Sequence, residues 1–305
     1  MICRFVALVS KPLRCNASFF VFMYALGCIC AWATLPNVRG AHLYYNLFPE
    51  LFLDVYMLAL VLTLMPRRVR PWVRGIFYFI LYVVAVVDVY CFVKFHSSLT
   101  PTMLLLVGET DSREAGEFLR SCVSPDVLFS SVGWVVLLMF IHLLVALQLR
   151  FPHFVPKNWC RLFWSLFDRF GLMLKRVRPV TQWTVLLLLI GSIASSSYNK
   201  AAFIKLMSGR TIGDVEHTLT EKRPANLYQP IYRLVFSLYA NTLTAKQVDR
   251  LVARVDKARV DSCSFRSPNI ILIIGESYNR HHSAQYGYCM PTTPVSYTHL
   301  RAHET

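Results

Sequence analysis

Long apolar stretches separated by short polar loops dominate the chain as far as residue 198. Five of these stretches are long enough to cross a hydrocarbon core about 30 Å thick, which takes roughly 20 helical residues. They run approximately over Ala17–Leu35, Leu47–Met65, Val73–Phe92, Ser131–Leu149 and Trp183–Tyr198. We therefore predict an N-terminal polytopic α-helical membrane domain of five helices over residues 1–198.

Basic residues are concentrated before the first, third and fifth stretches. They are Lys11, Arg14, Arg67, Arg68, Arg70, Arg74, Arg150, Lys157, Arg161, Arg169, Lys175, Arg176 and Arg178. Because positively charged loops stay in the cytoplasm, this pattern predicts a cytoplasmic N-terminus and an external chain after Tyr198. Within the stretches, Asp54, Asp88 and His142 form no obvious ionisable pair, and we interpret each as isolated, with a place near a helix end.

The composition agrees with a membrane protein. The 305 residues are 55% hydrophobic and 16% charged, which is too apolar for an ordinary soluble domain. The formal net charge of +15 lies mostly in the loops, so membrane topology explains it and we expect no nucleic-acid partner. The nine cysteines include no metal-type C-x-x-C pair and predict no disulfide framework.

The first apolar stretch has a second interpretation. Lys11, Arg14 and the run ending in Ala31-Trp32-Ala33 resemble a cleavable signal peptide. The stretch is long for a signal peptide, and its removal would put the following loops out of register with the charge pattern. We therefore favour a retained membrane helix.

The loop between the third and fourth stretches carries two helix-start signals. Thr100-Pro101 combines an N-cap hydroxyl with proline at the first helical position. Asp111 and Glu114 match the N-cap and third positions of a further helix, so the favoured role of Glu114 is a cap. The alternative is that Thr110 and Glu114 hold the head group of a lipid.

Residues 199–266 form a polar linker that we expect to be helical in pieces. Val248, Leu251, Val252 and Val255 recur at helical spacing opposite basic residues, which predicts an amphipathic helix. Such a helix either lies in the membrane interface or packs on an outer domain. The aromatic residues expected to anchor this region at the interface are Trp183, Tyr228, Tyr232 and Tyr239.

A short run of β-branched residues follows the linker. Asn269–Ile274, bounded by Pro268 and Gly275, is typical of a strand buried on both faces of a parallel sheet. Glu276 follows at the carboxyl end of that strand, where open α/β sheets place ligands, and we expect its side chain to face open space. Ser277 is not a nucleophile elbow, because position 279 is Asn where the G-x-S-x-G motif needs glycine.

The combined pattern of five apolar stretches, a linker and the segment N-I-I-L-I-I-G-E-S…H-H-S-A-Q-Y-G-Y…T-T-P resembles the membrane phosphoethanolamine transferases of Gram-negative bacteria, in the alkaline phosphatase and sulfatase superfamily. The matching residues are Gly275, Glu276, His282, Tyr286, Gly287, Tyr288, Thr292, Thr293 and Pro294. The resemblance implies that residues 267–294 begin an α/β alkaline-phosphatase-like domain with its first strand. It also implies a zinc cofactor with Glu276 as a ligand.

The resemblance further implies a substrate-binding role for Thr110 and Glu114, which match two of the three residues that hold the donor head group. Leu106 stands at the third position, where the family has Asn, and Asn279 and His281 replace the common Arg and Asp. The family's nucleophilic threonine and remaining zinc ligands would lie past Thr305. We therefore assign no catalytic residue here, and we expect this chain alone to be inactive. Residues 295–305 do not continue the family pattern and are interpreted as a foreign tail.

The function implied is transfer of phosphoethanolamine from phosphatidylethanolamine to lipopolysaccharide, on lipid A or a core sugar. The implied location is the bacterial inner membrane, with several crossings and a periplasmic catalytic domain. One alternative is a glycerophosphate or other phospho-group transferase of the same superfamily. Another is a non-enzymatic membrane protein such as a small transporter.

Overall fold

The computed structural model describes residues 2–109, 116, 125–150, 178–259, 281, 283, 287, 289 and 290. In this part of the chain the regular elements are helices, with no strand among them. The predicted strand 269–274, Glu276, Thr110 and Glu114 lie outside the described residues, so these expectations stay predictions. The chain divides into one unit over residues 1–255, which holds all the helices described below, and a second over residues 256–305.

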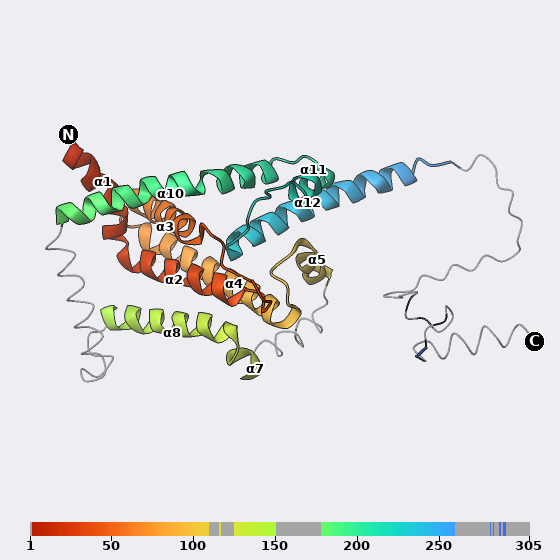
Figure 1. The fold of residues 1–305 in the computed structure, drawn as a ribbon, viewed down its shortest axis with the longest axis horizontal. Coiled ribbons are helices and arrows are strands. Elements are labelled where there is room, and N and C mark those ends of the chain that lie inside the picture. Colours follow the sequence, from red (N-terminus) through yellow and green to blue (C-terminus); the bar gives the residue numbers. More distant parts are fainter. Residues whose placement is uncertain are drawn as a thin grey trace, which may run out of the picture. The chain divides into compact units, whose positions relative to one another are not determined.

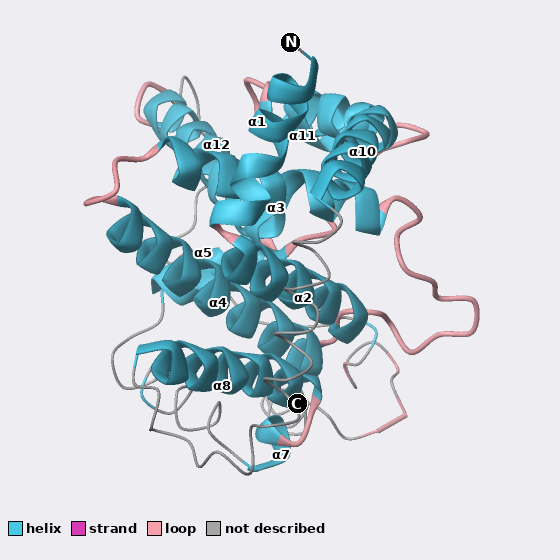
Figure 2. Cartoon of the chain, turned by 90° about the vertical axis from the view of Figure 1, so that its left-hand side faces the viewer, coloured by secondary structure: helices cyan, strands magenta, loops and turns pink. Residues whose placement is uncertain are grey.

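Six helices form the bundle, and Figures 1 and 2 show them in layers. They are α1 (Ile2–Cys15), α2 (Ala17–Ala33), α3 (Leu47–Leu64), α4 (Arg70–Phe95), α8 (Ser131–Arg150) and α10 (Arg178–Met207). Helix α10 packs on α1 and α3, while α8 packs on α2 and α4 at the opposite side of the bundle. The layers therefore run from α10 through α3 to the α2 and α4 pair and then to α8.

The remaining helices are α5 (Pro101–Glu109), α7 (Pro125–Leu128), α11 (Ile212–Leu219) and α12 (Pro230–Val255). Helix α12 packs against α4 and α5, and α11 bridges the end of α10 and α12. The predicted helix start at Thr100 is confirmed, because its hydroxyl accepts a hydrogen bond from Met103 N at 3.3 Å. The amphipathic pattern of residues 248–255 lies in α12, so that helix prediction is also confirmed.

All five predicted apolar stretches contain a helix, and two of these helices are long and apolar enough to span a membrane. These are α3 and α4. A third span results if Arg4–Cys15 and Ala17–Ala33, which are bent by 71° at their junction, are taken together. Helix α8 contributes a shorter apolar segment, Ser131–Leu147, and α10 extends well beyond its predicted bounds into polar sequence. The described residues thus contain two or three candidate membrane spans, which is consistent with a membrane protein, and five crossings stay a prediction.

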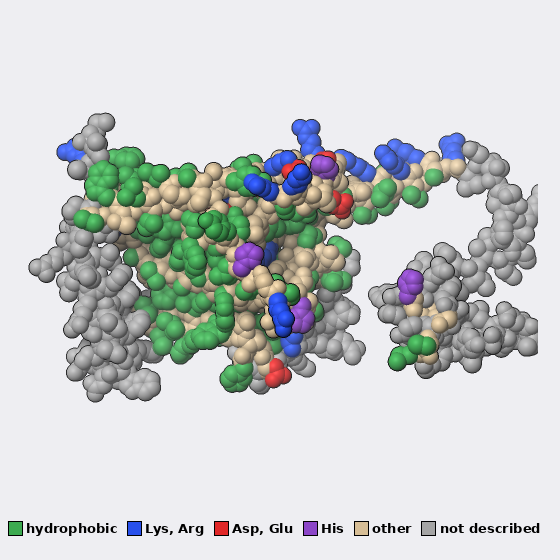
Figure 3. Space-filling model, in the orientation of Figure 1, with side chains coloured by type: hydrophobic (Ala, Val, Ile, Leu, Met, Phe, Trp, Pro, Cys, Tyr) green, Lys and Arg blue, Asp and Glu red, His purple; other side chains and the backbone are tan. Residues whose placement is uncertain are grey.

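The bundle has apolar side chains both inside and outside. Phe19 of α2, Val89 of α4 and Val135 of α8 are completely buried where the helices meet. Other residues, such as Phe79 and Leu187, are equally apolar but exposed. Figure 3 shows hydrophobic side chains over much of the bundle surface that is in view. A helix that is apolar all round fits a hydrocarbon surrounding, because lipid tails take the place of water.

Candidate functional site at the α3, α10 and α12 junction

Polar residues from three helices meet at the end of the bundle where α12 begins. We call Glu50, Asp54, Asn199, Lys200, Tyr228 and Tyr232 the junction cluster. Glu50 and Asp54 are four residues apart on α3 and therefore lie on one face of that helix. Asn199 and Lys200 come from α10, and the two tyrosines lie just before α12 and in its first turn.

Asp54 is held by three donors. The Lys200 Nζ atom donates to Asp54 Oδ1 at 2.6 Å, and the Tyr232 hydroxyl donates to the same oxygen at 2.9 Å. The Tyr228 hydroxyl donates to Asp54 Oδ2. The Lys200 ammonium also lies 4.4 Å from the centre of the Tyr232 ring, within cation–π range. These contacts fasten α12 to α3 and α10 through a single carboxylate.

Glu50 is completely buried and has two donors of its own. Asn199 Nδ2 donates to Glu50 Oε2 at 2.8 Å, and the Tyr44 hydroxyl donates to Oε1 at 2.7 Å. Lys200 Nζ lies 4.0 Å from Oε2, so one ammonium faces two carboxylates. A buried carboxylate needs such partners, because leaving it unpaired away from water costs several kcal/mol. The formal charge of the cluster is negative.

A second ion pair fixes α12 to α4. The Arg233 guanidinium contacts Asp88 Oδ2, and Asp88 is completely buried. The Leu99 amide donates to Asp88 Oδ1 at 3.0 Å, and Arg233 Nε donates to the Leu227 carbonyl at 2.9 Å. The carboxylate and the guanidinium therefore each have a further partner.

The interpretation of Asp54 and Asp88 as isolated is wrong. Their cationic partners, Lys200 and Arg233, both follow the last predicted stretch, so no inspection of one stretch could reveal the pairs. His142 is not isolated either, because one ring nitrogen is hydrogen-bonded to the Tyr82 hydroxyl at 3.0 Å. Glu50 was not singled out, although its four-residue spacing from Asp54 in an apolar stretch was an available signal.

Tyr228 and Tyr232 have a different role from the predicted interfacial anchors. Tyr228 is only 4% exposed, and both hydroxyls bind Asp54. Burial, reinforced by the neighbouring carboxylate of Asp54, raises the pKa of both phenols far above the usual range. The two tyrosines therefore stay protonated and remain hydrogen-bond donors at physiological pH.

An apolar pocket of about 460 Å³ adjoins the junction cluster. Residues from α2, α3, α4, α10 and α12 line it, and Asp54 and Tyr232 belong to both the pocket wall and the cluster. The remaining lining is mainly aliphatic and aromatic, as in Leu26, Phe77 and Leu81. A pocket with mostly apolar walls and a few polar groups is the usual form of a small-molecule site.

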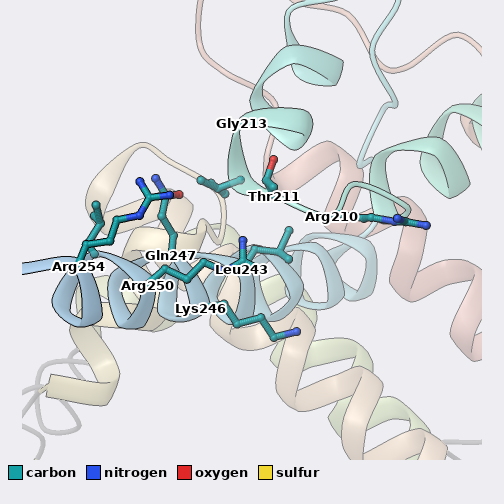
Figure 4. Close-up of a pocket in the computed structure, with 10 residues that line it drawn as sticks. Arg210, Thr211, Gly213, Leu243, Lys246, Gln247, Arg250 and Arg254 are labelled. Carbon is teal, nitrogen blue, oxygen red and sulfur yellow. The ribbon is translucent and has the colours of Figure 1, made fainter. Parts of the chain in front are cut away.

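A second pocket, of about 350 Å³, is basic and lies between α12 and the start of α11, as Figure 4 shows. Its four cationic side chains are those of Arg210, Lys246, Arg250 and Arg254. Within the described ranges none of them forms a salt bridge, and Figure 3 shows Lys and Arg gathered over α11 and α12. Such a surface attracts anionic groups.

The start of α11 is closed by a reciprocal capping box. Asp214 Oδ2 accepts hydrogen bonds from the Arg210 and Thr211 amides at 3.0 Å, and Thr211 Oγ1 accepts one from the Asp214 amide at 3.2 Å. Hydrogen bonds from Thr211 and Arg210 hold the pKa of the Asp214 carboxyl below its usual range. The anion-attracting end of this helix is thus already occupied by a carboxylate of the chain itself.

Thr110, Glu114 and Glu276, the residues assigned a site role from the sequence, all lie outside the described residues. Helix α5 ends at Glu109, immediately before Thr110, and both Glu114 and Glu276 lie outside the described residues. Among the residues that the structure does describe, no three His, Cys, Asp or Glu side chains are grouped to hold a metal ion. The zinc assignment stays a prediction from the sequence.

Comparisons of this chain with protein-family models, with curated proteins and with solved structures found no match. The resemblance to phosphoethanolamine transferases therefore rests on the sequence segment around Glu276 and on the order of the apolar stretches. The junction cluster and its adjoining pocket are defined by geometry alone.

Proposed function

We propose that this protein is the membrane and linker part of a phosphoethanolamine transferase. It would take phosphatidylethanolamine from the bilayer and pass the phosphoethanolamine group to lipopolysaccharide, on lipid A or a core sugar, at the periplasmic face of the inner membrane. The observation that carries the proposal is the junction cluster. It ties α12, which precedes the Asn269–Pro294 segment in the sequence, to helices α3 and α10 of the bundle.

A transferase that acts on membrane lipids needs its reacting groups at a fixed height above the bilayer, because a small misplacement costs much of the rate. Two buried carboxylates and one half-buried carboxylate hold the start of α12 on the bundle, through Lys200 and Arg233. The proposal assigns zinc binding to Glu276 and head-group binding to Thr110 and Glu114. Zinc would supply a Lewis acid for the phosphoryl group.

The basic pocket on α12 supports an acceptor that carries negative charge. Four cations without a salt bridge among the described residues would favour a glycolipid bearing phosphate groups. Transfer of an amine-bearing group onto such a glycolipid would lower its negative charge. This is the outcome expected when phosphoethanolamine is added to lipopolysaccharide.

The test is a transfer assay in membranes, with labelled phosphatidylethanolamine and lipopolysaccharide, on the protein expressed from its own gene. Chelation and Glu276→Ala should each reduce transfer at least about a hundredfold, because loss of a zinc ligand removes the metal's electrostatic contribution. Glu216→Ala, an exposed change on α11, should leave the rate unchanged. Full activity of Glu276→Ala would contradict the proposal.

A second candidate function is transport, favoured by the ionisable residues inside apolar helices. Asp88 is completely buried in α4, and charged groups within membrane helices often mark substrate or proton pathways. Under that function, purified protein in sealed vesicles would move a solute or protons across the bilayer. Transfer of label to lipopolysaccharide without such flux would decide for the transferase.

A further inference from the structure

The apolar pocket beside the junction cluster contains one polar group without a counterpart. Gln229 lies on its wall, directly before Pro230, the first residue of α12. Its residue exposure is 8%, and among the described residues no group accepts a hydrogen bond from its Nε2 atom. A buried amide without an acceptor is rare in folded proteins, so its presence on a pocket wall points to an acceptor supplied by a ligand.

The position of Gln229 is fixed on both sides. Its backbone carbonyl accepts hydrogen bonds from the backbone amides of Tyr232 and Arg233 at 3.1 and 3.2 Å, and these bonds anchor the backbone of Gln229 to the first turn of α12. Across the pocket wall, a Cβ atom on Gly27 would lie 2.7 Å from Gln229 Nε2 and 2.5 Å from Leu51 Cδ1. Glycine at position 27 therefore lets the amide lie between α2 and α3.

The side chains of the pocket walls limit which class of ligand can bind. The apolar lining matches a hydrocarbon chain, while Nε2 needs an oxygen acceptor at the end of that chain. A carboxylate ligand would face Asp54 on the same wall and Glu50 behind it, so an uncharged acceptor is favoured. Asp54 on the pocket wall is paired with Lys200, so both signs of charge occur near the pocket, and a zwitterionic head group is more compatible with them than a net anion.

We infer that this pocket binds one acyl chain of a glycerophospholipid, with the ester carbonyl accepting a hydrogen bond from Gln229 Nε2. The bundle presents apolar faces to lipid, so such chains surround the pocket at high concentration. This inference rests on the proposed lipid-handling function and adds to it the part of the lipid that is recognised. No residue assigned from the sequence takes part in this contact.

The test compares two forms of phosphatidylethanolamine, one with ester-linked and one with ether-linked chains of equal length. The ether form has no carbonyl oxygen and keeps only the weaker ether acceptor, so the ester form should satisfy Gln229 better. The 305-residue chain is reconstituted in nanodiscs of each lipid, and native mass spectrometry measures how many lipid molecules it retains. We expect the wild type to retain the ester lipid about tenfold more strongly, the effect of one buried hydrogen bond.

Variants test whether the preference for the ester lipid arises in the pocket. Gln229→Leu should remove the difference between the two lipids, and Gly27→Ala should do the same by displacing the amide. Val235→Trp should lower retention of both lipids, because Val235 lines the pocket. Leu238→Trp is the matched control, because Leu238 is an exposed residue of the same helix and does not line the pocket.

Equal retention of the two lipids by the wild type would overturn the inference, and this comparison needs no variant to fold. An ester preference that persists in Gln229→Leu would overturn it as well. Phosphoethanolamine transfer without an ester preference would leave the proposed function standing and remove only the pocket. An ester preference without transfer would support the pocket and contradict the proposed function.

Discussion

Asp88 and Arg233 show how a single side chain can join distant parts of this protein. The aspartate is completely buried in an apolar helix, and its only cation among the described residues comes from α12. Taking both charges out of water is costly, and the pair offsets that cost only while both partners and their additional hydrogen bonds are present. Either charge buried without the other would strongly destabilise the folded protein.

We therefore predict that Arg233→Met destabilises the protein by about 3–5 kcal/mol, because it leaves the Asp88 charge buried without a counterion. The measurement is denaturant unfolding in detergent, followed by circular dichroism. The double variant Asp88→Leu with Arg233→Met should recover most of the loss, since it removes both charges. A double variant as unstable as the single one would show that packing, and not charge, causes the effect.

The Asp214 capping box predicts a pH dependence of local stability. Because the folded-state pKa of Asp214 is lowered, its contribution is present above the unfolded value and is lost as the pH falls through the folded one. The protection factor of the Thr211 amide, its intrinsic exchange rate divided by the observed rate at the same pH, should fall in that acidic range when it is followed by NMR from neutral to acidic pH. In Asp214→Ala the same amide should be weakly protected at every pH, and a wild-type protection factor that does not change with acid would contradict the assignment.

At the scale of elements, the junction cluster holds the start of α12 against α3 and α10. Helix α12 is held by Tyr232 in its first turn and by Tyr228, two residues before its first residue Pro230, and both hydroxyls donate to Asp54 of α3. Lys200 of α10 supplies the positive charge at the centre. The start of α12 thus depends on the relative position of α3 and α10.

We predict that Lys200→Met loosens the start of α12 by about 1–3 kcal/mol, the usual cost of removing a hydrogen bond to a charged group that stays buried. Hydrogen exchange of residues 228–240, measured by mass spectrometry, should rise accordingly. Lys205→Met is the control, because the Lys205 and Glu221 pair is mostly exposed and worth little. Equal effects of both variants would mean that the cluster does not hold α12.

At the scale of the whole molecule, the basic loops and the apolar bundle together predict how the chain crosses the membrane. Reporter fusions after Arg70 and Arg178 should read cytoplasmic, and a fusion after Lys200 should read periplasmic. Phosphatase and fluorescent-protein reporters provide opposite readouts for each side. A cytoplasmic fusion at Lys200 would overturn the topology and, with it, the proposed periplasmic transfer.

The sequence by itself determined most of the helices of the bundle, although α1 was not among those predicted. Apolar runs marked all five bundle helices named from the pattern, Thr100 marked the start of α5, and the valine and leucine spacing marked the second half of α12. These signals are local, because apolarity, capping and helical periodicity are each set by residues close together in the chain. Glu276 and its strand remain expectations of this kind.

Only the tertiary structure decided which polar residues meet. Lys200 and Arg233 lie 146 and 145 residues from Asp54 and Asp88, and such pairings depend on how helices pack rather than on local pattern. The unpaired amide of Gln229 likewise became visible only once Gly27 and Leu51 were placed against it. A buried charge is compatible with many partners in the sequence, and the packing of the bundle selects one.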